Sequence, residues 1–123
     1  IEIQLLSQDK LSLSTDRYKL SQAVYNLLTN AYKFTDSRGK VTVDYGEFQD
    51  GVRIIIEDTG AGISREEQSH IFDAYYRGSN SDDHTGEGIG LYVAMQNIER
   101  IGGSLEVESE PGKGSRFVIW LPA

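Results

Sequence analysis

Two amphipathic helical segments, each followed by a pair of strand-like segments, limit the folds open to this chain more than any other feature. Residues 17–34 carry apolar side chains at steps of three and four, and a second such stripe begins near Leu91. Each stripe covers only one side of its helix, so each helix can bury only one face. Strands are predicted over 40–48, 52–57, 104–109 and 115–121. This order predicts an α/β (α+β) two-layer sandwich, with a mixed, mainly antiparallel sheet and the helices packed on one face.

Local signals define the connections between these elements. The pair Asp50-Gly51 is a strong signal for a hairpin between the first two of those strands. Ser64 and Glu67 match a capping box and predict a short helix that extends to about Phe72.

The ends of the long elements are also marked. Asp16 is a suitable N-cap for the first helix, and residues 2–6 are predicted to form an edge strand. Residues 77–88 are polar and rich in Gly and Ser, which is typical of a loop.

Composition restricts the partners. The 123 residues fit a single domain over 1–123. A formal net charge of −7 disfavours nucleic acid, because nucleic-acid-binding domains usually present a basic surface. The sequence has no cysteine and no apolar run near the roughly 18 residues of a membrane span. We expect a cytoplasmic domain without direct membrane contact. Because it begins at Ile1 and not at a methionine, we also expect a fragment of a longer protein, which another segment could anchor in a membrane.

A polar stripe runs along the first helix. Asn26, Asn30 and Lys33 fall at i, i+4 and i+7, on a face offset from the apolar one. Amide oxygens can bind a hard cation such as Mg²⁺, and the ammonium would lie beside phosphates that share the ion. The stripe taken alone fits a solvated polar face equally well.

A carboxylate precedes a double-glycine turn. Asp58 directly follows a buried strand, and Gly60 and Gly62 come next. A carboxylate at a strand end can accept a hydrogen bond from an amino group, such as the exocyclic amino group of adenine, while the glycines let the backbone approach a ligand. For this segment alone, a simple tight turn with Asp as turn former is the favoured interpretation.

A third segment, rich in glycine, leads into the second helix. Gly86, Gly88 and Gly90 alternate immediately before Leu91. A glycine loop that opens a helix presents free N–H groups and the positive end of the helix dipole, and both favour phosphate. A flexible linker that happens to contain three glycines is the alternative.

Five segments occur in a fixed order and spacing: 26–35, 58–63, 71–77, 86–91 and 112–117. Together they closely resemble the N box, first glycine box, F box, second glycine box and terminal motif of the catalytic domain of sensor histidine kinases. These belong to the superfamily of gyrase, chaperone, kinase and MutL-type ATPases. The resemblance covers nearly the whole chain and implies a Bergerat-type ATP-binding fold, with ATP and Mg²⁺ as cofactors.

The resemblance also implies roles for individual residues. Asn30 would bind Mg²⁺ with Asn26 assisting, Lys33 and Arg77 would contact phosphate, and Asp58 would read adenine. Residues 77–88 would form a lid over ATP. Further nucleotide contacts are implied at Tyr32, Phe34, Gly60, Gly62, Ile63, Tyr76, Gly86, Gly88, Ile89, Gly90, Leu91 and Ser115.

Two positions depart from the family pattern. Tyr75 stands where phenylalanine is commoner, which keeps an aromatic ring and adds a hydroxyl. Glu87 stands where threonine is frequent, and since a carboxylate would repel phosphates we expect it to face solvent.

One position bears on the reaction. Hydrolases and serine kinases of the superfamily carry a glutamate, as general base, where this chain has Asn26. A neutral amide cannot take a proton near neutral pH, whereas an acceptor imidazole already has a lone pair. Asn26 therefore favours a protein-histidine kinase. The alternatives are a nucleotide-binding module without transfer, and an ATPase or serine kinase of the same superfamily.

The resemblance implies partners as well. The accepting histidine would lie in a helical dimerisation domain that precedes Ile1, and a response regulator would receive the phosphoryl group. We expect His70 to be an ordinary surface residue of the short helix and His84 an ordinary residue in solvent, because neither has the sequence context of an acceptor. The isolated domain is expected to be monomeric and the parent protein homodimeric.

Overall fold

The computed structural model describes residues 2–6, 13–74 and 89–123. Its elements, in chain order, are β1 (Glu2–Leu5), α1 (Arg17–Phe34), β2 (Lys40–Phe48), β3 (Gly51–Asp58), α2 (Arg65–Gln68), α3 (Gly90–Arg100), β4 (Ser104–Ser109) and β5 (Ser115–Pro122). The long helices and all the strands agree with the sequence-based expectation to within about two residues, the usual uncertainty of element ends.

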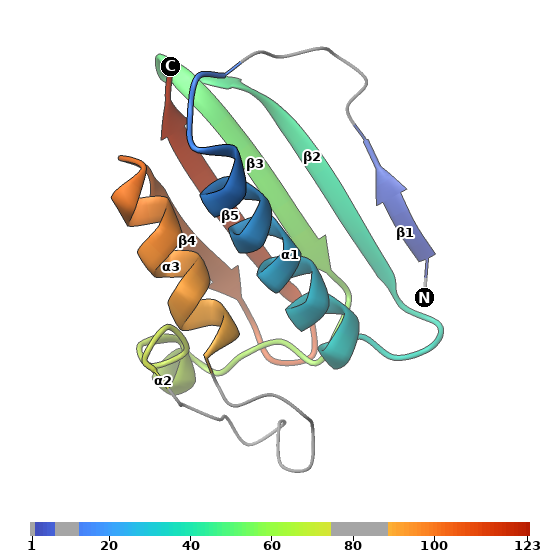
Figure 1. Ribbon diagram of the computed structural model, residues 1–123. Helices are drawn as coiled ribbons and strands as arrows, with labels where there is room; N and C mark the ends of the chain where they lie inside the picture. Colours follow the sequence, from blue (N-terminus) through green and yellow to red (C-terminus); the bar gives the residue numbers. More distant parts are fainter. Residues whose placement is uncertain (1, 7–12, 75–88) are drawn as a thin grey trace.

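The five strands form one sheet in the order β1-β2-β3-β5-β4. β1 pairs with β2 in parallel, and every other pair is antiparallel. Figure 1 shows α1 and α3 side by side on one face of this sheet, with β1 at the edge beyond α1. The predicted two-layer sandwich is therefore confirmed. No helix in the described part of the chain is both long enough and apolar enough to cross a membrane.

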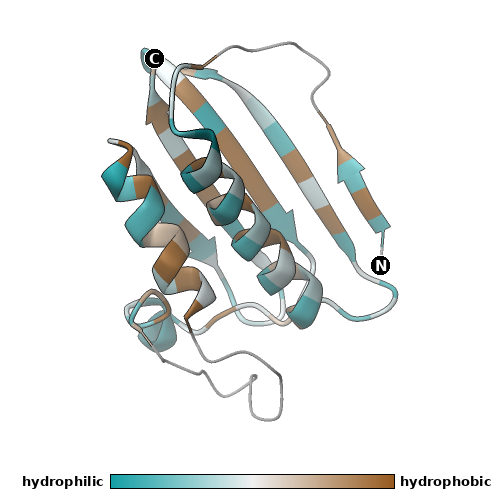
Figure 2. Ribbon diagram, viewed as in Figure 1, coloured by the Kyte–Doolittle hydropathy of each residue, from teal (hydrophilic) through white to brown (hydrophobic). Residues whose placement is uncertain are grey.

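The core lies between the two helices and the sheet. Strand residues on the helix side are apolar at every second position. In Figure 2 the colours alternate along β2, whereas the middle of β3 is apolar throughout. Each large apolar side chain buried here contributes about 1.5–3 kcal/mol to folding. The buried core consists of Ala23, Leu27, Ala31, Val41, Ile56, Ile71, Ala94, Ile98, Leu105, Phe117, Ile119 and Leu121.

The short helix ends earlier than predicted. Ser64 caps it as expected, because its Oγ accepts a hydrogen bond from the backbone N–H of Glu67 at 3.2 Å. The helix nevertheless stops at Gln68, and the N–H of His70 bonds back only three residues, to the Glu67 carbonyl. The following turn carries the Phe72 ring to an edge-to-face contact with a ring of the core, 6.2 Å between centroids. Tertiary packing of Phe72 thus overrides the extension of the helix.

The first hairpin forms where the Asp-Gly signal placed it, but with a shifted turn. Gln49 and Asp50 occupy the two central positions with φ of 48° and 59°, and Phe48 pairs with Gly51. Gly51 is the buried first residue of β3, where a Cβ atom would overlap the carbonyl oxygen of Leu121. The glycine is therefore required by packing between strands, and the turn takes its left-handed conformation from the two residues before it.

Candidate functional site

Asp58 is a buried carboxylate at the end of β3. The register of the sheet puts it on the helix side, paired with Val41 and Ser115, and only 5% of its surface is exposed. Its Oδ1 accepts a hydrogen bond from the Gly60 N–H at 2.8 Å. Desolvation raises the pKa of Asp58 above its ordinary value, while backbone hydrogen bonds from Gly60 and Ser115 partly oppose the shift. A carboxylate held in such a costly position is a candidate binding group.

The loop after Asp58 fits tightly between two neighbours. A Cβ atom at Gly60 would overlap the Phe34 carbonyl at the end of α1. A Cβ at Gly62, whose φ is +77°, would overlap the Glu110 carbonyl in the turn between β4 and β5. These two close approaches explain why glycine stands at both positions.

Serine hydroxyls link this loop to the end of the sheet. Ser109 Oγ accepts the Ile63 N–H at 2.8 Å and donates to the Gly114 carbonyl at 2.8 Å. The Oγ of Ser115 lies 2.9 Å from the Oγ of Ser109, and Ser115 is the antiparallel partner of Asp58. Because the single proton of Ser109 is used by Gly114, Ser115 donates in that pair. The predicted site residue Ser115 is thus tied to both Asp58 and the loop.

The polar stripe of α1 meets the start of α3. Asn26 Nδ2 donates to the Gly90 carbonyl at 3.1 Å, across 64 residues of sequence. Asn30, one turn further along α1, is half-buried, and Lys33 is exposed in the last turn. Ile89, the N-cap of α3 and the first described residue before it, makes no side-chain hydrogen bond to the helix, and N–H groups in the first turn of a helix are of the kind that binds an anion.

The amides of this stripe fit Mg²⁺ as a bound ion. The hydrogen bond to Gly90 uses the nitrogen of Asn26, so its oxygen is the atom that can bind a cation. In the described ranges, no group of three or more His, Asp or Glu side chains could hold a metal alone. An ion held by Asn26 and Asn30 would complete its shell with water and phosphate oxygens, which is the usual arrangement for Mg²⁺.

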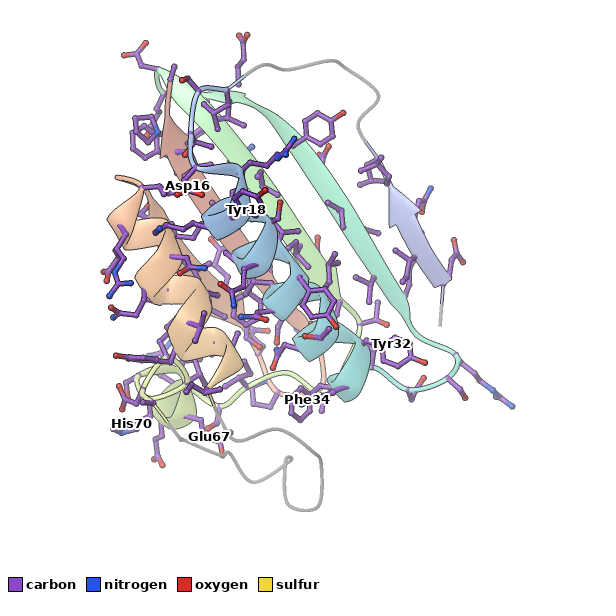
Figure 3. The ribbon with its side chains drawn as sticks, in the orientation of Figure 1. Asp16, Tyr18, Tyr32, Phe34, Glu67 and His70 are labelled. Carbon is purple, nitrogen blue, oxygen red and sulfur yellow. The ribbon has the colours of Figure 1, made fainter. Side chains whose placement is uncertain are left out.

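The structure therefore brings predicted residues together in two groups along the C-terminal half of α1. Its C-terminal end meets the loop that follows Asp58, and Phe34 is labelled there in Figure 3. Asn26 and Asn30 lie earlier on the helix, towards α3. The first group consists of Phe34, Asp58, Gly60, Gly62, Ile63 and Ser115, and the second consists of Asn26, Asn30, Ile89 and Gly90.

Three predicted contacts are placed in neither group, and one of them, Lys33, is exposed in the last turn of α1. Tyr32 is 61% exposed and projects from the side of α1 away from α3, as Figure 3 shows. At 100° per residue it lies roughly 160° around the helix from Asn30, so the two side chains point in nearly opposite directions. Leu91 is half-buried and packs against the core.

Several predicted residues lie outside the described ranges. They are Arg77, Tyr76, Gly86, Gly88, Tyr75, Glu87 and His84, together with the expected lid over 77–88. His70 is described and is exposed, but it lies in the turn after α2 and not on the helix, with its Nδ1 3.2 Å from Asp73 Oδ2.

Two residues of the site escaped the sequence reasoning. Ser109 follows Leu105 and Val107 at every second position on the helix side of β4. A serine in a series of apolar residues is a weak signal of a polar role at that position. Gln68, whose amide bonds the loop, stands in a short polar helix and carries no comparable signal.

The family model for histidine kinase-, DNA gyrase B- and HSP90-like ATPases matches residues 15–123. The chain is 37% identical over 111 residues to the sensor protein EvgS of Escherichia coli (strain K12), covering 87% of this chain and 9% of that protein. It is 33% identical to the sensor histidine kinase ZraS of the same strain, covering 99% of this chain and 26% of that protein. It therefore spans about a quarter or less of these relatives.

A solved structure of a similar protein has the same fold as this chain. Full-length ShkA in complex with AMPPNP aligns with a TM-score of 0.86 and 28% identity, over 98% of this chain and 25% of that one. The family match covers four of the five strands, both long helices and the site at the end of β3. The chain belongs to the family of histidine kinase-, DNA gyrase B- and HSP90-like ATPases.

Proposed function

We propose that this domain binds Mg-ATP and transfers its γ-phosphoryl group to a histidine on a separate helical domain, as a protein-histidine kinase of two-component signalling. The observation that carries the proposal is the buried carboxylate of Asp58 beside a glycine loop. Relatives of this chain are named sensor histidine kinases, and one similar structure is named as a complex with AMPPNP, an adenine nucleotide in which nitrogen replaces one bridging oxygen of the triphosphate.

The base would be bound at the C-terminal end of α1. Asp58 accepts a hydrogen bond from the exocyclic amino group of adenine, which is stronger than a neutral bond because the acceptor is ionised. Gly60 and Gly62 let the loop beside the base pack closely against the end of α1 and the turn between β4 and β5, and the half-buried side chains of Phe34 and Ile63 provide apolar surface for the base. Ser115 supports the carboxylate from the neighbouring strand.

The phosphates would extend along α1 towards the start of α3. The oxygens of Asn26 and Asn30 would hold Mg²⁺, which neutralises charge on the phosphates during transfer. Lys33 and Arg77 would add positive charge, and the N–H groups at the start of α3 would bind phosphate oxygens. The lid over 77–88 would exclude water.

The residues favour a histidine acceptor over water. Asn26 offers an amide whose nitrogen already donates to the Gly90 carbonyl, and an amide cannot remove a proton from water. A neutral imidazole needs no such base. The partners would be a histidine-bearing dimerisation domain of a homodimeric parent protein and a response regulator, in the cytoplasm.

A transfer assay tests the reaction directly. The domain is mixed with labelled Mg-ATP and a histidine-bearing helical domain encoded upstream of it, and the label on that histidine is followed with time. Phosphohistidine on the added domain supports the proposal. Rapid release of free phosphate by the domain alone would favour the ATPase alternative, and binding without transfer would favour a nucleotide-binding module.

Asn30→Ala is expected to impair the magnesium-dependent step selectively. Removing an amide ligand should reduce transfer by about 10- to 100-fold, the range typical of groups that support a bound metal. ADP affinity measured without Mg²⁺ should change by less than about twofold, since Asn30 is proposed to act through the ion and not through the base. Tyr32→Ala, on the opposite side of the same helix, is the matched control. An equal loss of ADP affinity with and without Mg²⁺ would contradict the metal-binding role.

A further inference from the structure

We propose that Gln68 is a positioning residue for the nucleotide base, which holds the loop between Gly60 and Ile63 at a fixed distance from Asp58. The inference rests on the proposed adenine site. It concerns a residue on α2 that does not belong to the predicted set of nucleotide contacts.

The side-chain amide of Gln68 bridges two segments. Its Nε2 donates to the Ile63 carbonyl at 2.8 Å and to the Ser109 carbonyl at 2.9 Å. An amide nitrogen has two hydrogens, so both are used, one for the loop and one for the end of β4. Gln68 is half-buried, and therefore the two bonds are partly shielded from water.

Ile63 is held from its other side as well. Its N–H donates to Ser109 Oγ, so both polar groups of this one residue are bonded, one to Gln68 and the other to Ser109. Ser109 Oγ also contacts Ser115, the strand partner of Asp58. A continuous set of hydrogen bonds thus connects one wall of the proposed base site, at Ile63, to the strand that carries the other, at Asp58.

The loop needs such a constraint. Between Asp58 and Ile63 it contains two glycines, whose backbone is the least restricted of any residue. A loop that must be ordered at the moment of binding lowers affinity, because the ordering entropy is then taken from the binding energy. Holding Ile63 in advance keeps the site at the width that places the amino group of adenine against the carboxylate. The bonds of Gln68 therefore act on recognition of the base.

The test compares two purine nucleotides that differ at the group Asp58 would read. IDP carries an oxygen at the ring position where ADP carries the amino group. Dissociation constants for both are measured by calorimetry on the whole 123-residue chain. Gln68→Met keeps the length of the side chain and removes both donors, and Gln96→Met makes the same change at a half-buried position on α3. Melting temperatures are recorded for all variants.

We expect Gln68→Met to weaken ADP binding roughly fivefold or more while IDP binding changes by less than about twofold. The preference for ADP should shrink accordingly, and Gln96→Met should keep the preference of the unaltered chain. Ser109→Ala, which removes the acceptor of the Ile63 N–H, should shrink the preference in the same direction. A loss of folded protein lowers both affinities equally, so the ratio separates positioning from stability.

Two results would overturn the inference. One is an unchanged ratio of ADP affinity to IDP affinity in Gln68→Met or in Ser109→Ala. The other is a loss of both affinities in step with the melting temperature, which would assign Gln68 a purely structural role. If the unaltered chain fails to bind ADP in the presence of Mg²⁺, the proposed function itself falls, so the two failures are distinguishable.

Discussion

Asp58→Asn is expected to weaken ADP binding by about tenfold or more. A hydrogen bond to an ionised partner contributes about 1.5–3 kcal/mol, and each 1.4 kcal/mol corresponds to a factor of about ten in the dissociation constant. The substitution preserves the size of a side chain that is almost fully buried, so the loss should come from the missing acceptor charge. Calorimetry with ADP measures the effect. Asp50→Asn, in the hairpin at the other end of β3, is the matched control.

The environment of Asp58 leads us to expect opposite pH responses for ADP affinity and for folding stability. Because burial raises the pKa of Asp58, lowering the pH from neutral protonates it before an ordinary aspartate. ADP affinity of the unaltered chain should fall over that range, while that of Asp58→Asn should fall less. The contribution of Asp58 to folding stability should respond in the opposite direction and rise as the pH is lowered. The folded state binds this proton more readily than the unfolded chain, so the unaltered chain should gain stability relative to the variant as the pH falls towards about 4. An ADP affinity equal in the two proteins at every pH would remove Asp58 from the binding site.

Gly114→Ala is expected to destabilise the domain by about 2–5 kcal/mol. The residue has a φ of +84°, and a non-glycine residue in the left-handed region costs about 1–2 kcal/mol. Its Cβ atom would also overlap the carbonyl oxygen of Asp58, and overpacking of this kind typically costs a further 1–3 kcal/mol. Any backbone shift that relieves the overlap moves the strand end that carries the carboxylate, so ADP affinity should fall together with stability.

Gly112 provides a close control for that prediction. It lies in the same turn with a φ of +80°, but no atom lies within 4 Å of a Cβ built there. Gly112→Ala should therefore cost only the conformational part, about 1–2 kcal/mol, and should leave ADP affinity nearly unchanged. The measurement is urea unfolding of both variants with the same ADP titration. Equal destabilisation by the two substitutions would show that contact with Asp58 is unimportant.

The regular elements could be predicted because their signals are local. The stripe on α1 and its Asp16 cap depend on residues three or four apart, and the cap is present, with Asp16 Oδ1 accepting the Lys19 N–H at 3.0 Å. Strand alternation is equally local, because side chains at every second position share one face of a strand. The errors occurred where distant residues compete with local preference. Phe72 packs against the core and is not part of the short helix. Gly51 packs against the neighbouring strand, and the two residues before it form the turn.

The candidate site shows the same division. The sequence by itself determined the kinds of group available: a carboxylate after a buried strand, glycines beside it, and amides spaced on one helix face. The tertiary structure alone decided which of them meet, because a hydrogen bond of about 3 Å depends on how elements far apart in the chain pack together. Asn26 reaches Gly90 across 64 residues, and Gln68 reaches Ser109 across 41. No local pattern encodes those distances, since they arise only when both helices and the loop are fixed against one sheet.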